Sequence, residues 1–444
     1  MMKYWNSLLR LEISLCKGGR MAYSLDDIFI DTIFEAKDIY DVNFKVKPNT
    51  HPILAVECSV KESQNIESIV RNLHDKNLTI FIYIGEQKKD LFTGIVKDCK
   101  LVCNNKINTL KMKVMGFSVM LDKEKHTRIF QDKELTYKEV LNHTMSKKIG
   151  KVIFNKEDTK IERLLFQYNE TDWQFMKRVS GLGESILIPL FYENEVRLSY
   201  GLPRSAKEIE LKEDFYASGN HIYDKSKDYD IKGIYHMFYS DEDYELGTVV
   251  KNKGLRFVIC EKEAQTVEAT LKFHYKVCKE ENIRSKRVYN EKIRGLVISA
   301  EVVDVKAEDI FVKFSMESGV EKKRYKLEWL PVTGNVMYCM PEVGAKVKVY
   351  FGNSDEGKNV FAIECENMSA FSNEIKGIVT KDGKTIHIKD TGVELKADNK
   401  VNISGKNMTF NSSDSLLISA RKKVKIKSDM VEINADKNIN IQKN

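Results

Sequence analysis

"VNISGKNMTFNSSDSLLISARKKVKIKSDMVEINADKNINI", residues 401–441, follows a short repeat in which two apolar residues flank one polar residue and a polar spacer precedes the next doublet. Counted from Ile386, eight doublets occur at intervals of seven or eight residues. Side chains two positions apart lie on the same face of a strand, so each doublet places two apolar side chains on one face. The pattern predicts a stacked prism or solenoid with one short strand per repeat. Ordinary hairpins are the weaker alternative, because they rarely keep so even a spacing.

A strand with only two inward apolar residues buries too little surface to be stable by itself. We therefore expect residues 381–444 to complete their core with other copies of the chain, as an intertwined trimeric β-prism, or triple-stranded β-helix. A single-chain solenoid is the alternative that the repeat length leaves open. The residues expected to pack at the trimer axis are Ile386, Ile388, Val393, Leu395, Val401, Ile403, Met408, Phe410, Leu416, Ile418, Val424, Ile426, Val431, Ile433, Ile439 and Ile441.

Composition places the chain among globular proteins. Its 444 residues, 42% of them hydrophobic and six of them proline, suggest about two to four domains. The net charge of +7 is mild, and no basic segment interleaved with aromatic residues is present, so we expect no nucleic-acid recognition. The eight cysteines form no CxxC pattern and are expected to be reduced. Cys99 and Cys103 are the only close pair, and their spacing on a strand is too wide to bridge easily.

The first twenty residues are predicted to be a non-native leader. Residues 17–20, Lys-Gly-Gly-Arg, can be encoded by a purine run that resembles a bacterial ribosome-binding site, so translation is expected to begin at Met21. Arg10 and Glu12 interrupt the only apolar segment that a signal peptide would need, and no stretch is long enough to span a membrane. We expect a protein that is made in the bacterial cytoplasm.

Residues 21–290 are predicted to form a β-rich domain with a few helices. Strand-like runs occupy 53–61, 79–116 and much of 187–290. A helix is expected over residues 63–75, where apolar residues follow the helical period.

Two further helices carry start signals in the sequence. Thr136 with Glu139 and Thr171 with Gln174 each form a capping box, in which two side chains satisfy the free backbone N–H groups of the first turn. Gly181 is expected to end the second of these helices in the left-handed conformation.

Residues 291–367 contain five strand-like runs in a length that suits a closed five-stranded barrel of the oligonucleotide-binding (OB) type. Pro341 and Gly344 mark a turn before Val347 and Val349, whose side chains are expected to point inward.

Three stretches resemble one family in its own order: "HTRIFQDKELTYKEVLNHTM" (126–145), "LLFQYNETDWQFMKRVSGLGESILIPLFYEN" (164–194) and "MPEVGAKVKVYFGNSDEGKNVFAIECEN" (340–367). The chain is similar here to the valine-glycine repeat protein G (VgrG) family and to contractile phage baseplate hub-and-spike proteins. The resemblance implies a tube-like hub domain over 21–290 and an OB-type neck over 291–367, followed by a β-prism. Some phage spikes carry a lysozyme domain between neck and prism, but the linker expected here is too short for one.

The sequence contains no motif of an activated nucleophile, and we predict that the protein is not an enzyme and has no catalytic, cofactor-binding or metal site. The glycines before Glu184 lack the spacing of a phosphate-binding loop. His387 is a single histidine, which makes it a poor candidate metal ligand. The acidic run 241–243 is expected to be a solvated loop. The linker is expected at 368–380.

The resemblance implies a structural hub-and-spike protein of a contractile injection system: a phage tail, a tailocin, an extracellular injector or a type VI-type machine. The chain would join the tube to a membrane-piercing tip, as a homotrimer with tube and baseplate components as partners. A phage or surface fibre adhesin, whose single-chain β-solenoid binds a glycan or receptor, is the alternative. The charged outward residues of the repeat, such as Lys389, Glu394 and Lys425, favour the spike.

Two smaller expectations concern the tail. Its last strands would have open edges, so we expect a PAAR-type tip protein or an equivalent cap around residues 439–444. The run "RKKVKIK" would form, in three copies, a belt of about fifteen positive charges facing the anionic polymers of a target envelope. Simple solubility is the alternative role. The residues of this possible envelope contact are Arg421, Lys422, Lys423, Lys425 and Lys427.

Overall fold

The structure of the chain is a computed structural model. The residues that it describes are 23–60, 65–104, 107–145, 149–220, 228–316, 324–331, 339–366, 375–380 and 382–442. The expected leader and the expected start at Met21 lie outside these ranges. The chain divides into two units, residues 1–366 and 367–444, and each is described by itself. No helix among the described residues combines the length and the apolar character that a membrane span needs.

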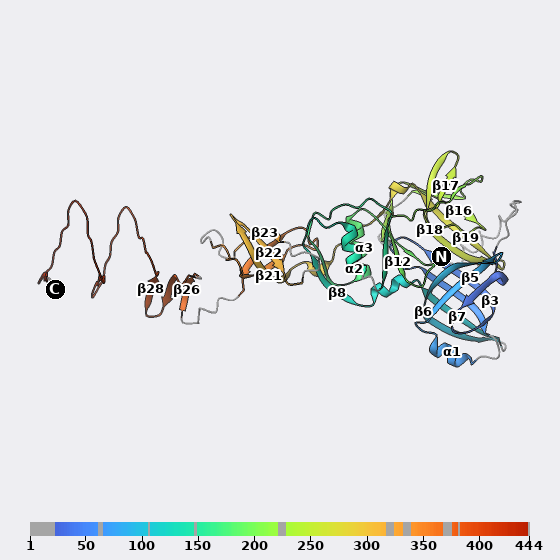
Figure 1. Cartoon of the computed structure of the whole chain (residues 1–444), viewed down its shortest axis with the longest axis horizontal. Helices are drawn as coiled ribbons and strands as arrows, with labels where there is room; N and C mark the ends of the chain where they lie inside the picture. Colours follow the sequence, from blue (N-terminus) through green and yellow to red (C-terminus); the bar gives the residue numbers. More distant parts are fainter. Residues whose placement is uncertain are drawn as a thin grey trace. The chain divides into compact units, whose positions relative to one another are not determined.

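A curved sheet forms the largest part of residues 23–290, which we call the hub region. In the described residues this sheet has 13 strands, ten of them in one continuous path and three attached as branches. The path runs, in spatial order, through β14 (Ala217–Asn220), β16 (Ile234–Ser240), β19 (Thr270–Cys278), β18 (Leu255–Val267), β3 (Ala36–Val46), β4 (Ile53–Val60), β7 (Ile107–Met115), β6 (Gln87–Asn104), β5 (Asn77–Ile84) and β2 (Ile28–Asp31). The branches are β1 (Tyr23–Ser24), β17 (Val249–Asn252) and β13 (Glu208–Glu210). β1 pairs with β19 and β2 pairs with β5, although only η2 (Leu25–Asp27) separates β1 from β2. The sheet therefore curls, and its blue and yellow strands lie side by side in Figure 1.

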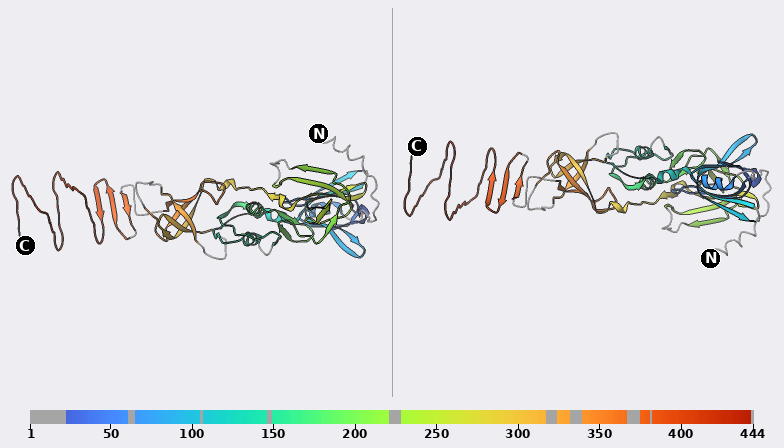
Figure 2. Two further views of the ribbon diagram at one scale, coloured as in Figure 1. Left: turned by 90° about the horizontal axis from the view of Figure 1, so that it is seen from above. Right: turned by 90° about the horizontal axis from the view of Figure 1, so that it is seen from below.

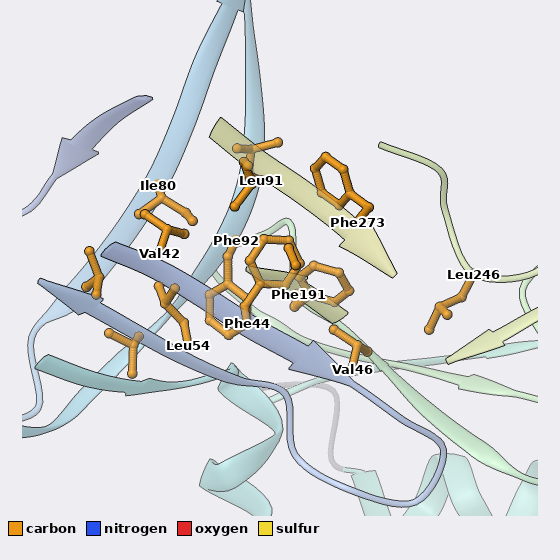
Figure 3. Close-up of a cluster of buried hydrophobic side chains, with 14 of the residues drawn as sticks. Val42, Phe44, Val46, Leu54, Ile80, Leu91, Phe92, Phe191, Leu246 and Phe273 are labelled. Carbon is orange, nitrogen blue, oxygen red and sulfur yellow. The ribbon is translucent and has the colours of Figure 1, made fainter. Parts of the chain in front are cut away.

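Alternating apolar side chains direct one face of this sheet into a large core. In β3, Val42, Phe44 and Val46 are fully buried, whereas the residues between them are not. Figure 3 shows how aromatic rings from distant strands converge around Phe44: its ring centroid lies 5.8 Å from that of Phe92 and 6.3 Å from that of Phe273. The period of two in the sequence thus decides which side chains fill the hub core.

Asp243 belongs to the acidic residues that are buried in the hub region. Asp243 is buried, so the expectation of a solvated loop is wrong for this residue. Its carboxylate pairs with the fully buried Lys262 and lies 2.9 Å from Nζ of Lys89. Nζ of Lys262 also lies 5.3 Å from the ring centroid of Phe273 and 5.4 Å from that of Phe44. An isolated charge in such a core would be very costly, and this pairing offsets the cost.

Three α-helices occur in the described part of the hub region: α1 (Ile66–Asn72), α2 (Tyr137–Met145) and α3 (Asp172–Leu182). The first lies inside the predicted range 63–75. Both predicted capping boxes are confirmed. The N–H of Thr136 donates to the Glu139 carboxylate over 2.8 Å, and α3 begins with reciprocal bonds between Thr171 and Gln174.

Gly181 does not end α3, so the predicted stop at this residue is wrong. The helix continues to Leu182, Gly183 caps it with a φ of −79°, and Glu184 takes the left-handed conformation with a φ of 51°. A Cβ atom at Gly181 would lie 2.4 Å from the carbonyl oxygen of Lys286. This glycine is therefore needed for the close approach of a distant segment to the helix rather than for a turn.

Smaller sheets connect the large sheet to the rest of the first unit. They are β8 (Lys125–Phe130) with β10 (Leu165–Thr171), β11 (Leu187–Leu190) with β12 (Val196–Tyr200) and β9 (Gly150–Phe154), and β15 (Tyr229–Ile231) with β20 (Ile283–Ser285). Besides η2, the described part of the first unit contains the 3-10 helices η3 (Phe117–Asp122), η4 (Glu280–Asn282) and η5 (Glu291–Ile293). β10 leads directly into α3, so its pairing with β8 sets the position at which that helix begins.

The predicted five-stranded barrel is confirmed. Its strands close in the order β21 (Leu296–Lys306), β22 (Asp309–Phe314), β23 (Tyr325–Trp329), β25 (Val360–Cys365) and β24 (Lys346–Phe351). Val347 and Val349 are fully buried, as expected for inward residues of β24. β22 and β24 alternate buried and more exposed residues, which a small barrel needs because its interior is filled by side chains.

The second unit begins with an antiparallel sheet of β26 (Ile375–Val379), β27 (Thr385–Lys389) and β28 (Gly392–Lys396). β26 falls inside the segment that was expected to be a linker. Directly opposite residues of paired strands share a face. Ile378 lies opposite Ile386, which lies opposite Leu395, and Ile388 lies opposite Val393, so five apolar side chains gather on one face.

These three strands pair within one chain. This pairing at the base of the tail differs from the predicted intertwined prism. In such a prism the neighbours of each strand belong to other copies of the chain. The reason is local: only two residues, Asp390 and Thr391, separate β27 from β28, which is the length of a tight hairpin. Beyond β28, residues 397–442 run back and forth without forming further strands (Figure 2).

Candidate functional site: the hub–barrel joint and the tail

The three motif stretches of the sequence meet where the barrel adjoins the hub region. β8 carries residues of the first stretch, β10 and α3 carry the second, and the loop between β24 and β25 carries the third. Arg178 of α3 and Glu356 of this loop are 178 positions apart in the sequence, and their side chains form an ion pair with 2.5 Å between Nη1 and Oε1. The joint is thus built from segments that the sequence keeps far apart.

Arg178 is the centre of the joint. Its side chain is 3% exposed and that of Glu356 is 0% exposed. Nη2 of Arg178 donates to the Glu170 carboxylate over 2.7 Å and to the carbonyl oxygen of Phe166 over 2.8 Å. Burial acts to lower the pKa of the Arg178 guanidinium, but the Glu356 and Glu170 carboxylates outweigh burial, so this pKa is raised. Arg178 therefore stays charged inside the joint.

A second ion pair supports the first. Arg163 contacts Asp355, the residue before Glu356, and the Asp355 side chain is 4% exposed. Gly357 follows in the same loop, and a Cβ atom there would lie 2.4 Å from the Arg163 guanidinium. The loop thus fits closely around this arginine. We call Arg163, Glu170, Arg178, Asp355 and Glu356 the clasp.

Apolar packing and backbone bonds continue across the joint. Ile129, Leu164 and Phe166 of the hub region are fully buried in the same hydrophobic cluster as the barrel core. The N–H of Ile129 donates to the carbonyl oxygen of Met316 at the end of β22, over 3.1 Å. The N–H of Phe314 donates to Oε1 of Gln131 over 3.3 Å. The barrel core is therefore partly closed by side chains from the hub.

A polar network holds the hub side of the joint in place. Arg128 donates to Asp172 over 2.7 Å and to Gln167 over 3.1 Å, and Gln167 donates to Asp172 over 2.9 Å. Asp172 is the first residue of α3, where a negative charge is favoured by the helix dipole. This network links β8, β10 and α3, and so orients the helix that carries Arg178.

The clasp was not predicted from the sequence, although most of its residues lie inside the quoted motif stretches. Glu170 lies between Asn169 and Thr171, and Arg178 follows Lys177, so polar neighbours in the sequence hide the burial of both residues. A charge that is buried is expected to be paired. The identity of the partner depends on tertiary contacts and has no signature in the local sequence.

The tail exposes its apolar doublets in the single chain. All sixteen residues expected at the trimer axis are exposed, from 38% at Ile386 to 88% at Ile441. The sheet of β26, β27 and β28 brings the first four of them together on one face, while the remaining twelve lie on the unpaired residues 401–441. Soluble monomers rarely expose contiguous apolar surface on this scale. The surface of the tail therefore has the character of an interface.

The positively charged run and the tail end are also at the surface. Arg421, Lys422, Lys423, Lys425 and Lys427 are all exposed. Ile439 and Ile441 are exposed as well, whereas the last two positions of the expected tip contact, 443 and 444, lie outside the described residues.

The described residues contain no group of three or more metal-ligating side chains close enough together to hold a metal ion. His387 lies on the polar face of β27, with Nδ1 3.9 Å from the Glu394 carboxylate of β28. The neighbouring Lys389 lies 2.9 Å from the same carboxylate. These residues thus belong to a cross-strand charge cluster on the outer face of the tail sheet.

No family model matches the sequence, and no curated protein matches it. Solved structures match its fold. The E. coli c3393 protein, a component of the type VI secretion system with structural similarity to the T4 bacteriophage tail proteins gp27 and gp5, is 9% identical, and the match covers 75% of this chain and 98% of that one with a TM-score of 0.51. The chain shares the fold of this protein. A chain of the Francisella PdpA–VgrG complex in its lidded form is 9% identical over 83% of this chain and 79% of that one, with a TM-score of 0.52. In the lidless form of that complex the matching chain is 10% identical over 83% of this chain and 97% of that one, with a TM-score of 0.51.

The parts of this chain follow one another in a simple order. The curved β-rich hub region comes first, the closed five-stranded barrel follows, and the repetitive tail comes after it. The clasp lies where the first two of these parts meet.

Proposed function

We propose that this protein is the homotrimeric hub and spike of a contractile injection system: a phage tail, a tailocin, an extracellular injector or a type VI-type machine. The observation that carries the proposal is a tail of regularly spaced, exposed apolar doublets that follows a VgrG-type hub and barrel. Its role is mechanical rather than enzymatic: the hub region joins the tube, the barrel forms a neck, and the tail forms the point that crosses the target envelope.

The exposed doublets favour association of the tails. Two apolar residues per strand cannot close a core within one chain, but three copies around one axis supply six such side chains for each level of doublets. Hydrophobic burial contributes roughly 25 cal/mol for each Å² removed from water, so a long stack of such levels stabilises the assembly strongly. In residues 401–441 the strands of other copies supply the hydrogen-bonding neighbours that are missing within one chain.

A single-chain solenoid is less consistent with residues 401–441. A folded solenoid would bury its inward doublets within one chain, whereas the twelve doublet residues of this segment are exposed. A receptor-binding fibre is also less well supported. The outer face of this sheet carries Lys389 and Glu394 rather than an aromatic ladder that would stack on a glycan.

The proposed function is tested on assembled particles. We expect the protein, carrying an affinity tag, to co-purify with tube, sheath and baseplate proteins, which are made in the same cytoplasm. An electron cryo-microscopy map of these particles should show three copies at the end of the tube. Recovery of the protein without tube or sheath components, or a map with a different copy number, would contradict the proposal.

The same map tests a cap on the spike. We expect density for a small PAAR-type tip protein or an equivalent cap in contact with the doublet Ile439 and Ile441, because both apolar side chains are exposed. A well-resolved prism that ends bare would rule out this partner.

The positively charged run is proposed to touch the target envelope transiently. We expect binding of the full-length protein to anionic liposomes or to a teichoic-type polymer, with a loss of most binding when Arg421, Lys422, Lys423, Lys425 and Lys427 are all changed to Gln. Raised ionic strength should weaken binding of the unchanged protein. Binding that is unaffected by the five substitutions would assign the run to solubility alone.

A further inference from the structure

We propose that the clasp fixes the barrel to the hub region, so that residues 23–366 unfold and move as one cooperative body. The proposal goes beyond the proposed function and does not depend on it, because it concerns contacts within one chain. It assigns a role to the five charged residues of the joint.

The ion pairs of the clasp are buried between the barrel and the hub region. Arg178 is almost fully buried and bonds to Glu170 in the hub region and to Glu356 in the barrel loop. The N–H of Phe166 in β10 also donates to the Glu356 carboxylate, over 3.3 Å. Displacement of the barrel would break all the bonds of Glu356 together. Breaking a buried ion pair is strongly unfavourable when one charge remains buried without its partner.

The contacts between the barrel and the hub region differ in how strongly they fix orientation. Hydrophobic contact is non-directional, so the apolar packing of Ile129 and Phe166 allows the barrel to rock or slide. Charged hydrogen bonds of arginine have a fixed geometry. Arg178 forms such a bond with Glu356, and Arg163 forms an ion pair with the adjacent Asp355, so the charged contacts of one barrel loop restrict movement of the barrel more than apolar packing does.

The segment by which the chain enters the barrel, residues 290–292, is also bonded to the hub region. Nδ2 of Asn290 donates to the carbonyl oxygen of Tyr168 over 2.8 Å, and Nζ of Lys292 donates to that of Asn169 over 3.0 Å. Both acceptors lie in the bulge of β10, three residues or fewer from Glu170. The entry segment and the clasp are therefore anchored to the same strand.

A mechanical consequence follows if the proposed function holds. Axial force applied to the hub would reach the barrel through α3 and β10 without bending at the joint. The experiment below does not use an injection assay, so its outcome is independent of the proposed function.

The chain provides one tryptophan reporter on each side of the joint. Trp173 lies in α3 and stacks on His51 of the hub region at 4.5 Å between ring centroids, and Trp329 lies in β23 of the barrel. Both variants are made in full-length protein that also carries Trp5→Phe. Trp173→Phe then leaves Trp329 as the reporter of the barrel, and Trp329→Phe leaves Trp173 as the reporter of the hub region. Thermal unfolding is then followed by fluorescence for each. We expect coincident midpoints in the two backgrounds.

Glu356→Gln keeps the shape of the side chain and removes its charge. We expect it to lower the midpoint of the Trp329 transition by roughly 5 °C or more below that of the Trp173 transition. Gly357→Ala should separate the two transitions in the same direction, because its Cβ displaces the Arg163 guanidinium while every charge is kept. The matched control is Asp309→Asn, which breaks an exposed barrel pair with Lys326 and should leave the two midpoints coincident.

Three results would overturn the proposal. The first is two separate transitions in the unchanged protein. The second is that the Trp329 and Trp173 midpoints coincide in Glu356→Gln and also in Gly357→Ala, even if both midpoints are lower than in the unchanged protein. The third is an equal separation in the control, Asp309→Asn.

Discussion

If the protein forms the proposed trimer, Ile418→Asp or Ile426→Asp is expected to abolish its resistance to heat and detergent. In a single chain both side chains are exposed, at 68% and 74%. At the axis of a trimer they would be buried, and each substitution would place three carboxylates together there. A buried unpaired charge costs several kcal/mol, and the three like charges also repel one another. Gel mobility without boiling and the mass from light scattering measure the loss.

The control is Lys425→Glu, which changes the charge of an outward residue between Val424 and Ile426 and should leave the trimer intact. The prediction also separates the assembly models. A single-chain solenoid would give monomers whose tails stay folded at low concentration, with slow hydrogen exchange over residues 401–441. That result would contradict association of the tails.

Loss of the Asp243 charge is expected to be the most damaging conservative change within the hub region. Asp243→Asn leaves the fully buried Lys262 ammonium without its anionic partner, and removal of one member of a buried pair typically costs about 3–5 kcal/mol. Guanidinium unfolding of the hub, followed by Trp173 fluorescence, should show this loss at pH 7. The control is Asp214→Asn, which breaks an exposed pair with Lys253 and is expected to cost at most about 1 kcal/mol.

The same substitution has a defined pH dependence. Burial alone would raise the pKa of the Asp243 carboxyl, but Lys262 and Lys89 outweigh burial and hold the pKa below its usual value. A carboxyl whose pKa is lowered in the folded state stabilises the fold above its unfolded pKa, about 3.9, and loses this contribution as the pH falls through the folded value. The difference in free energy of unfolding between Asp243→Asn and the unchanged protein should therefore be largest at pH 7 and become smaller as the pH falls below about 4. An equal difference at pH 3 and pH 7 would contradict this account.

Local features of the fold were predictable because their causes lie close together in the sequence. The capping boxes at Thr136 and Thr171 depend on residues three positions apart, and both formed as predicted. The barrel was predictable because five alternating runs of suitable length leave few other ways to close a sheet. The turn before Val347 and Val349 likewise fixed which residues point inward.

Other features were misread because their causes are remote. Gly181 has the sequence context of a helix stop, yet it is a glycine because the backbone of Lys286 approaches it closely. Asp243 lies in an acidic run typical of a loop, yet Lys262 and Lys89 from two other strands draw it into the core. The clasp joins Arg178 to Glu356, which are 178 positions apart, so neither residue carries a local sign of its partner.

The sequence by itself determined most elements of the first unit: the alternation of the hub strands, the barrel and the helix starts all follow from side chains within a few residues of one another. Only the tertiary structure decided how the charged residues are used. Hydrophobic burial depends on which residues are apolar, a property that each residue carries by itself. A buried charge is tolerated only beside a specific partner, and this pairing exists only once the chain has folded.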